Sequence, residues 1–230
     1  MLNHLSDLRK RLLVALGAIG GFSALIYVYK EWVLQLLLQP LLDLPHAPQV
    51  MTTGIAELFF VYFKLAGYGG LFMAFPVLFY LVWNFVSPGL YEREKRIVIP
   101  ALIAIPCLFY CGALFAYFVV LPLALQFFFG FEQVGVVQMP HLADYLSFFM
   151  MSAFAFGAAF NLPVVLVLLV AAGFLSVSQL IAARRWMIVA IFVVAAALTP
   201  PDPISQSFLA VPLVILYECA IFLAKRVRGL

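Results

Sequence analysis

The basic residues of this chain are confined to a few short segments, and long apolar stretches separate them. Eleven of the 13 lysines and arginines fall into four groups: Arg9/Lys10/Arg11, Arg93/Lys95/Arg96, Arg184/Arg185 and Lys225/Arg226/Arg228. In short loops, lysine and arginine mark the cytoplasmic side of a membrane protein. All four groups can lie on that side only if the chain crosses the bilayer six times, with both termini in the cytoplasm.

The composition favours a membrane protein over an ordinary soluble domain. Hydrophobic residues make up 67% of the 230 residues and charged residues only 10%, whereas soluble domains carry about 25% charged residues. We therefore expect a single integral membrane domain over residues 1–230, all α-helical, with no separate soluble domain. The net charge of +3 then reports orientation in the membrane rather than binding to nucleic acid.

Six apolar stretches are candidates for spanning helices, which need about 20 residues each. We predict these helices at about residues 12–29, 55–86, 97–121, 142–172, 186–199 and 206–224. The connections on the outer side are then residues 30–54, 122–141 and 200–205. Helices 5 and 6 are expected to be short. Only 14 residues separate Arg185 from Pro200, which is about 21 Å of helix.

No recognisable catalytic motif is present, and the three histidines lie in terminal or loop segments. We therefore expect neither an enzyme nor a cofactor. Cys107 and Cys111 would share a helix face at an i,i+4 spacing, but no histidine or carboxylate nearby completes a metal site. We expect these two cysteines and Cys219 to be small buried hydrophobic residues and no metal to be bound.

Polar residues inside a predicted span are costly and are candidates for function. Glu57 and Lys64 lie seven residues apart in the second span. They either partly neutralise each other or make separate polar contacts with other helices. Asn161 lies two residues before Pro163. Its amide either bonds the carbonyl that the proline leaves free or lines a polar cavity.

Three positions near the ends of the spans are further candidates. Pro40 lies in the first outer connection. Asp202, in the last outer turn, is expected to cap the sixth helix. Glu218 lies about two turns before the C-terminal basic group, so we expect it to pair with an arginine or a lysine at the inner face.

The turn after the second span combines acidic and basic residues. Residues 92–96 comprise two acids and three bases and are consistent with a solvated helix start that local ion pairs stabilise. Alternatively, Glu94 and Asp7 meet across the inner face and bind a cationic ligand. Carboxylates suit a guanidinium group, because its planar fork makes two parallel charged hydrogen bonds. The residues by themselves leave both interpretations open.

Several segments of the chain together resemble the TatC family, the multispanning core of twin-arginine protein translocases. The resemblance covers nearly the whole chain. The motifs that carry it are His4-Leu-x-Asp-Leu-Arg-x-Arg-Leu12, Phe85-x-x-Pro-x-Leu-Tyr-x-x-Glu94, Phe115-Ala-Tyr-Phe118 with Leu121-Pro-Leu123, Thr199-Pro-Pro-Asp-x-x-Ser-Gln206, and Tyr217-Glu218.

The resemblance implies a multi-pass protein of the cell inner membrane that binds twin-arginine signal peptides at its cytoplasmic face. Together with single-span partners similar to TatA and TatB, and as a homo-oligomer within the complex, it would export folded proteins by using the proton-motive force. The residues that match the family's signal-binding patch are Glu94, Asp7, Phe85, Arg9, Arg11 and Arg96.

Other positions match a second site or depart from the family pattern. Thr199 and Gln206 match a polar site that binds partner helices. Asp7 stands where the family usually has glutamate, which keeps the charge and shortens the reach by about one bond. Asn161 stands where many members have an acid or glutamine, so a titrating role at that position is not expected to carry over.

Two other classes of function remain open. An ion- or proton-coupled solute transporter would use Glu57, Lys64, Asp202 and Glu218 as its polar pathway, although these residues fall at different depths instead of converging at mid-membrane. A purely structural membrane scaffold would show no preference among peptides.

Overall fold

The computed structural model describes residues 2–44, 50–52, 54–86, 92–130, 139–198 and 203–228, and every regular element in these ranges is a helix. The helices form two compact units. Unit 1 comprises Met1–Leu90 with Val137–Met150, and unit 2 comprises Tyr91–Val136 with Met151–Leu230. The all-helical prediction is therefore confirmed for the described residues.

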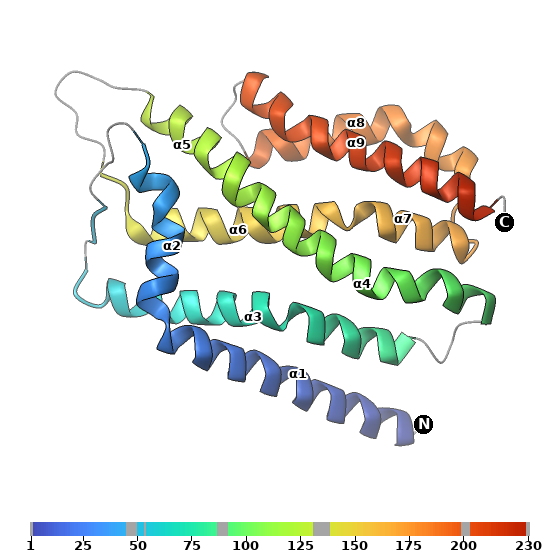
Figure 1. Cartoon of the computed structure of the whole chain (residues 1–230), viewed down its shortest axis with the longest axis horizontal. Helices are drawn as coiled ribbons and strands as arrows, with labels where there is room; N and C mark the ends of the chain where they lie inside the picture. Colours follow the sequence, from blue (N-terminus) through green and yellow to red (C-terminus); the bar gives the residue numbers. More distant parts are fainter. Residues whose placement is uncertain are drawn as a thin grey trace. The chain divides into compact units, whose positions relative to one another are not determined.

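Unit 1 contains α1 (Leu2–Val28), α2 (Lys30–Leu42), α3 (Glu57–Val86) and the first half of α6 (Leu142–Phe160). Helices α1 and α3 lie side by side and run antiparallel (Figure 1). The Nη1 of Arg11 donates to the carbonyl of Leu81 at 3.2 Å. Ser23, which lies 12 residues further along α1, packs against Gly70. An added Cβ at Gly70 would collide with the backbone of Ser23. Glycine therefore sets the close approach of the two helices at this point.

Helix α2 occupies much of the segment that the sequence predicted as an outer connection. Its buried residues Leu34, Leu37 and Leu41 recur at the spacing of one helical face. The hydroxyl of Tyr145, on α6, donates to the carbonyl of Leu37 at 2.6 Å. The prediction of residues 30–54 as a connection thus missed a helix, because the apolar stripe of α2 is too short to be a span.

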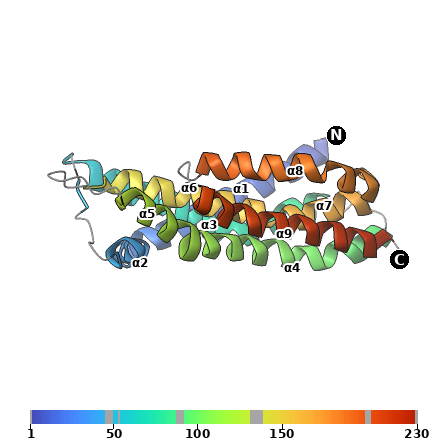
Figure 2. The same ribbon diagram turned by 90° about the horizontal axis from the view of Figure 1, so that it is seen from above.

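Unit 2 contains α4 (Glu92–Phe115), the π-helical turn η2 (Ala116–Val120), α5 (Leu121–Phe129), the second half of α6, α7 (Leu162–Ala171), α8 (Val177–Leu198) and α9 (Pro203–Arg228). Helix α4 continues through η2 into α5 as a single rod (Figure 2). Helices α8 and α9 form an antiparallel hairpin (Figure 1). The core gathers residues of η2, α6, α8 and α9, among them Ala116, Phe156, Ala195 and Leu209.

The third predicted span, residues 97–121, is too short at its C-terminal end. The predicted span ends at Leu121, yet the helix continues to Phe129. The π turn explains this, because the N–H of Leu121 bonds to the carbonyl of Ala116, five residues back. The wider turn carries the chain past Pro122, which has no N–H to contribute.

The prediction that helices 5 and 6 are short is also wrong as stated. Helix α8 has 22 residues instead of the predicted 186–199, and α9 has 26 residues instead of 206–224. Arg184 and Arg185 lie inside α8 rather than before it. The helices extend beyond their apolar parts because a helix can continue into an aqueous layer once its backbone hydrogen bonds are made.

Five helical stretches in the described part of the chain are long and apolar enough to cross a membrane. They are Arg9–Val28, Glu57–Asn84, Pro100–Phe129, Leu142–Ala171 and Val177–Ala196.

The three cysteines correct a prediction, because Cys107, Cys111 and Cys219 are exposed rather than buried. In a helix that faces lipid, an exposed thiol still has an apolar environment, so burial within the protein is not required.

Candidate functional site at the helix ends

The N-terminal part of α1 carries Arg9 and Arg11, two of the residues expected to face a signal peptide. Arg11 is half-buried and bonds to the carbonyl of Leu81, whereas Arg9 is exposed. The Arg11 contact fixes a guanidinium close to the C-terminal end of α3, where helix carbonyls favour a cation. The side chains of four other predicted site residues, Asp7, Phe85, Glu94 and Arg96, lie outside the described part of the structure.

The α8–α9 hairpin is held at one end by a charged contact. The Nη2 of Arg184 lies 2.7 Å from the Oε2 of Glu218. The neighbouring Tyr217 is buried, and its hydroxyl donates to the carbonyl of Leu180 at 2.8 Å. The expected pairing of Glu218 with a basic residue is therefore present. Its partner comes from the third basic group rather than from the C-terminal one.

The opposite end of the hairpin contains the predicted partner-helix site. The Nε2 of Gln206 donates to the carbonyl of Phe192 at 2.9 Å, so this amide connects α9 to α8. Gln206 is half-buried, and its Nε2 is already engaged within the chain. Thr199 and Asp202 lie outside the described residues.

Asn161 lies at the break between α6 and α7, and its side chain is 7% exposed. Its backbone N–H bonds to the carbonyl of Ala158, three residues back, which leaves the carbonyl of Gly157 to accept from Nδ2 at 2.8 Å. The amide thus bonds a backbone carbonyl other than the one that Pro163 frees, so the first sequence alternative named the wrong partner. Its buried Oδ1 has no hydrogen-bond partner among the described residues.

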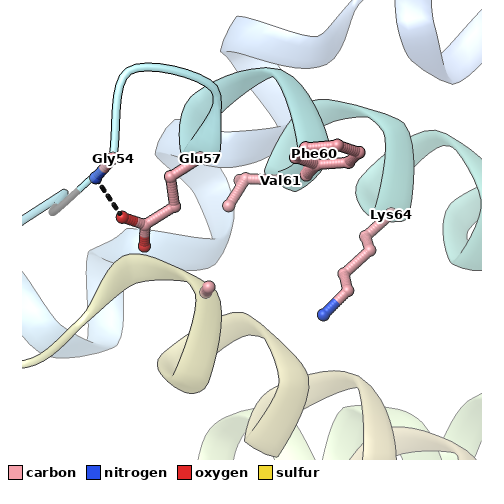
Figure 3. Close-up of a pocket in the computed structure, with 6 residues that line it drawn as sticks. Gly54, Glu57, Phe60, Val61 and Lys64 are labelled. Carbon is pink, nitrogen blue, oxygen red and sulfur yellow. Dashed lines mark hydrogen bonds between the residues drawn. The ribbon is translucent and has the colours of Figure 1, made fainter.

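The first turns of α3 border a pocket of about 350 Å³ (Figure 3). Glu57 and Lys64 both line it, with Phe60 and Val61 between them and Ala143 of α6 opposite. Glu57 accepts from the N–H of Gly54 at 3.2 Å and so caps the helix start. It does not pair with Lys64. Pro40, the other candidate on this unit, lies within α2.

Residues 3–212 match the family model described as the Sec-independent protein translocase protein (TatC). The chain belongs to the TatC family. The sequence resemblance is therefore confirmed over most of the chain, from the first turn of α1 into the first half of α9.

TatC proteins of several bacteria are similar to the chain along its length. The TatC of Magnetococcus marinus is 40% identical over 99% of this chain and 84% of the relative. That of Escherichia coli strain K12 is 40% identical over 98% of this chain and 88% of the relative. The TatC of Aquifex aeolicus is 38% identical over 96% and 93%, respectively.

Solved TatC structures have the same fold as this chain. A crystal structure of the twin-arginine translocase receptor TatC matches with a TM-score of 0.80 and 38% identity, over 98% of this chain and 99% of the other. A second TatC crystal structure, in the detergent DDM, matches with a TM-score of 0.81. Together with the five apolar helices, these matches make the chain a multi-pass protein of the bacterial inner membrane.

Some contacts of this TatC chain could not be found from the sequence. The Arg184–Glu218 pair joins residues 34 positions apart, and the Tyr145–Leu37 bond joins residues 108 positions apart. No local pattern signals either contact. The only available signal was that charged and hydroxyl groups within apolar helices require partners.

Proposed function

We propose that the chain is the signal-peptide-binding subunit of a twin-arginine translocase. In this role it binds twin-arginine signal peptides of folded precursor proteins at the cytoplasmic face and is not an enzyme. Single-span partners similar to TatA and TatB, and further copies of the chain, complete the complex, which the proton-motive force drives. The observation that carries the proposal is the match along 98% of the chain to a structure named as the twin-arginine translocase receptor.

We further propose six spans with both termini in the cytoplasm. Five stretches have the length and composition of spans, and α9, with 26 residues, supplies the sixth. The distribution of the basic groups supports this orientation. Within unit 2, the Arg184–Glu218 pair then lies at the cytoplasmic end of the α8–α9 hairpin, and Gln206 lies towards the outer end.

The binding site for the two arginines is proposed to contain Glu94 and Asp7, with Phe85, Arg9, Arg11 and Arg96 around them. A hydrogen bond to a charged group contributes about 1.5–3 kcal/mol, so two bound arginines supply about 3–6 kcal/mol. Micromolar binding needs about 8.2 kcal/mol. The apolar part of the signal peptide must therefore add contacts along a helix or in the adjacent bilayer.

The alternative transporter function has less support. Among its proposed pathway residues, Glu218 is engaged by Arg184 and Glu57 caps the start of α3. The first contact joins α8 to α9 and the second caps a helix, so both are structural. The TatC matches also concern translocase proteins rather than solute carriers.

Site-specific crosslinking of a signal peptide to the purified protein in lipid tests the receptor function. An Arg-Arg peptide is compared with a Lys-Lys peptide, and the wild type with Glu94→Ala. Glu92→Ala is the matched control, since it removes an acid from the same segment outside the proposed site. Selective crosslinks that only Glu94→Ala abolishes are expected. Equal crosslinking of both peptides would exclude Glu94 as the residue that distinguishes arginine from lysine.

A further inference from the structure

The pocket at the start of α3 contains an ammonium group without a partner among the described residues. Lys64 is exposed, and within the described part of the chain it makes no hydrogen bond, ion pair or cation–π contact. Figure 3 shows its side chain extending from α3 towards α6. A cation within an apolar span is costly unless it is hydrated or paired with an anion, and Lys64 falls inside the span Glu57–Asn84.

Neighbouring aromatic residues indicate the depth of Lys64 in the membrane. The ammonium of Lys30 lies 4.5 Å from the ring centroid of Tyr27 and 4.9 Å from that of Tyr62. Tyrosines that contact a cation at the end of a span are typical of the headgroup layer. Lys64 follows Tyr62 by two residues, about 3 Å along the helix. Its side chain is therefore within reach of lipid phosphates.

The wall of the pocket is apolar next to Lys64 and acidic at the start of the helix. Phe60, which lines the pocket one turn from Lys64, is 60% exposed. Phe63 precedes Lys64 outside the pocket lining and is 67% exposed. The carboxylate of Glu57 lies two turns from Lys64, about 10 Å along the axis. From the start of α3 inwards, the site thus presents the carboxylate of Glu57 and then the ammonium of Lys64, beside exposed aromatic surface.

We propose that this pocket binds the headgroup of a phospholipid that carries an ammonium group, such as phosphatidylethanolamine. The phosphate lies against Lys64, the headgroup ammonium lies towards Glu57, and the acyl chains pack on Phe60 and Phe63. Small Ala143 on α6 leaves the space that the headgroup fills. Placement of this lipid in the outer leaflet rests on the proposed topology, whereas binding itself does not.

Charge complementarity favours this lipid over an acidic side chain of a partner helix. A lone carboxylate would satisfy Lys64 but would be repelled by Glu57. A zwitterionic headgroup places its positive end next to the acid and its negative end next to the lysine. Its chains also cover aromatic surface that an isolated side chain would leave exposed.

Native mass spectrometry of the purified protein in detergent tests the proposal by titration with phosphatidylethanolamine, phosphatidylglycerol or diacylglycerol. Phosphatidylethanolamine is expected to bind more tightly than the other two, because phosphatidylglycerol lacks the ammonium and diacylglycerol also lacks the phosphate. Lys64→Met should weaken binding of phosphatidylethanolamine about tenfold, and Lys64→Arg should preserve it. Equal binding of diacylglycerol would overturn the proposal.

Three further variants separate specific binding from general effects. Lys30→Met removes a nearby positive charge outside the pocket and should leave binding unchanged. Ala143→Leu fills the pocket without changing any charge and should reduce binding, whereas Ser147→Leu, one turn along α6, should not. If Lys64→Met does not fold, Glu57→Gln still decides the matter, because it should shift preference from phosphatidylethanolamine towards phosphatidylglycerol. An unchanged preference would contradict the assigned headgroup orientation.

Three further measurements identify what occupies the pocket. Millimolar inorganic phosphate should fail to displace the lipid, since it lacks acyl chains; displacement would point to a free-phosphate site. If the Lys64→Met variant keeps its lipid affinity but loses co-purifying single-span partners, the occupant of the pocket is a partner helix and not a lipid. Glu94→Ala should bind lipid normally, so loss of signal-peptide recognition and loss of this site are distinguishable.

Discussion

Arg184 on α8 and Glu218 on α9 form an ion pair of 2.7 Å, and the side chain of each is 43% exposed. The pair lies beside the buried Tyr217, whose hydroxyl bonds to Leu180. Two polar contacts therefore fix the register of the α8–α9 hairpin at this end. Because α9 carries the C-terminal basic group, this contact also positions the last described residues of the chain.

Breaking this ion pair is expected to weaken the hairpin modestly. Exposed pairs contribute about 0.2–1 kcal/mol, so Glu218→Gln and Arg184→Met should each lower the stability by about that amount, and their effects should not add. A double-mutant cycle on thermal unfolding in detergent measures the coupling. Arg185→Met is the control because the neighbouring Arg185 is exposed and pairs with no described acid. Fully additive effects would show that the pair does not stabilise the hairpin.

The approach of α1 to α3 predicts opposite effects for two glycines on the same helix. Gly70→Ala places a Cβ against the backbone of Ser23, whereas at Gly67 the added Cβ meets no atom within 4 Å. Gly70→Ala should destabilise the fold by about 1–3 kcal/mol. Gly67→Ala should be neutral or slightly stabilising, because alanine favours helix over glycine. Thermal unfolding of both variants checks this, and equal shifts would mean that α1 packs elsewhere.

The break at Asn161 depends on its side-chain donor. Asn161→Asp replaces the Nδ2 that bonds the carbonyl of Gly157 with a second oxygen, so an acceptor faces an acceptor. We expect a loss of about 1–3 kcal/mol and a greater loss than for Asn161→Ala. Asn84→Asp is the matched control at an exposed position on α3. If Asn161→Asp proves as stable as the wild type, the amide donor is not required.

Gln206 makes one contact within the chain and is proposed to make a second contact with a partner helix. Its Nε2 bonds to Phe192, which leaves Oε1 as the atom available to a partner helix. Gln206→Leu and Gln206→Glu both remove the donor and should lower stability by about 0.5–1.5 kcal/mol.

Partner binding should distinguish the two Gln206 variants. Co-purification of single-span partners should fall more for Gln206→Leu than for Gln206→Glu, which keeps an acceptor. Cys219→Ala, an exposed change on the same helix, should alter neither readout. Equal partner loss for both Gln206 variants would remove Oε1 from the proposed contact.

The sequence by itself determined the class of the protein and much of its helical layout. Long apolar stretches must be helical in a bilayer, since each backbone group needs a partner within its own segment. The second and fourth predicted spans agree closely with α3 and with α6 and α7. The family motifs also identified the TatC family, because they depend on residue identity and not on geometry.

Only the tertiary structure decided the helix ends and the pairing of polar groups. Glu218 on α9 compensates the charge of Arg184 on α8, and no local pattern predicts a partner 34 residues away. Helix α2 is recognisable only once α3 and Tyr145 cover its leucines. The pocket around Lys64 likewise requires α6 to place Ala143 opposite α3. In each case the deciding energy comes from contacts between segments distant in sequence, which local periodicity does not encode.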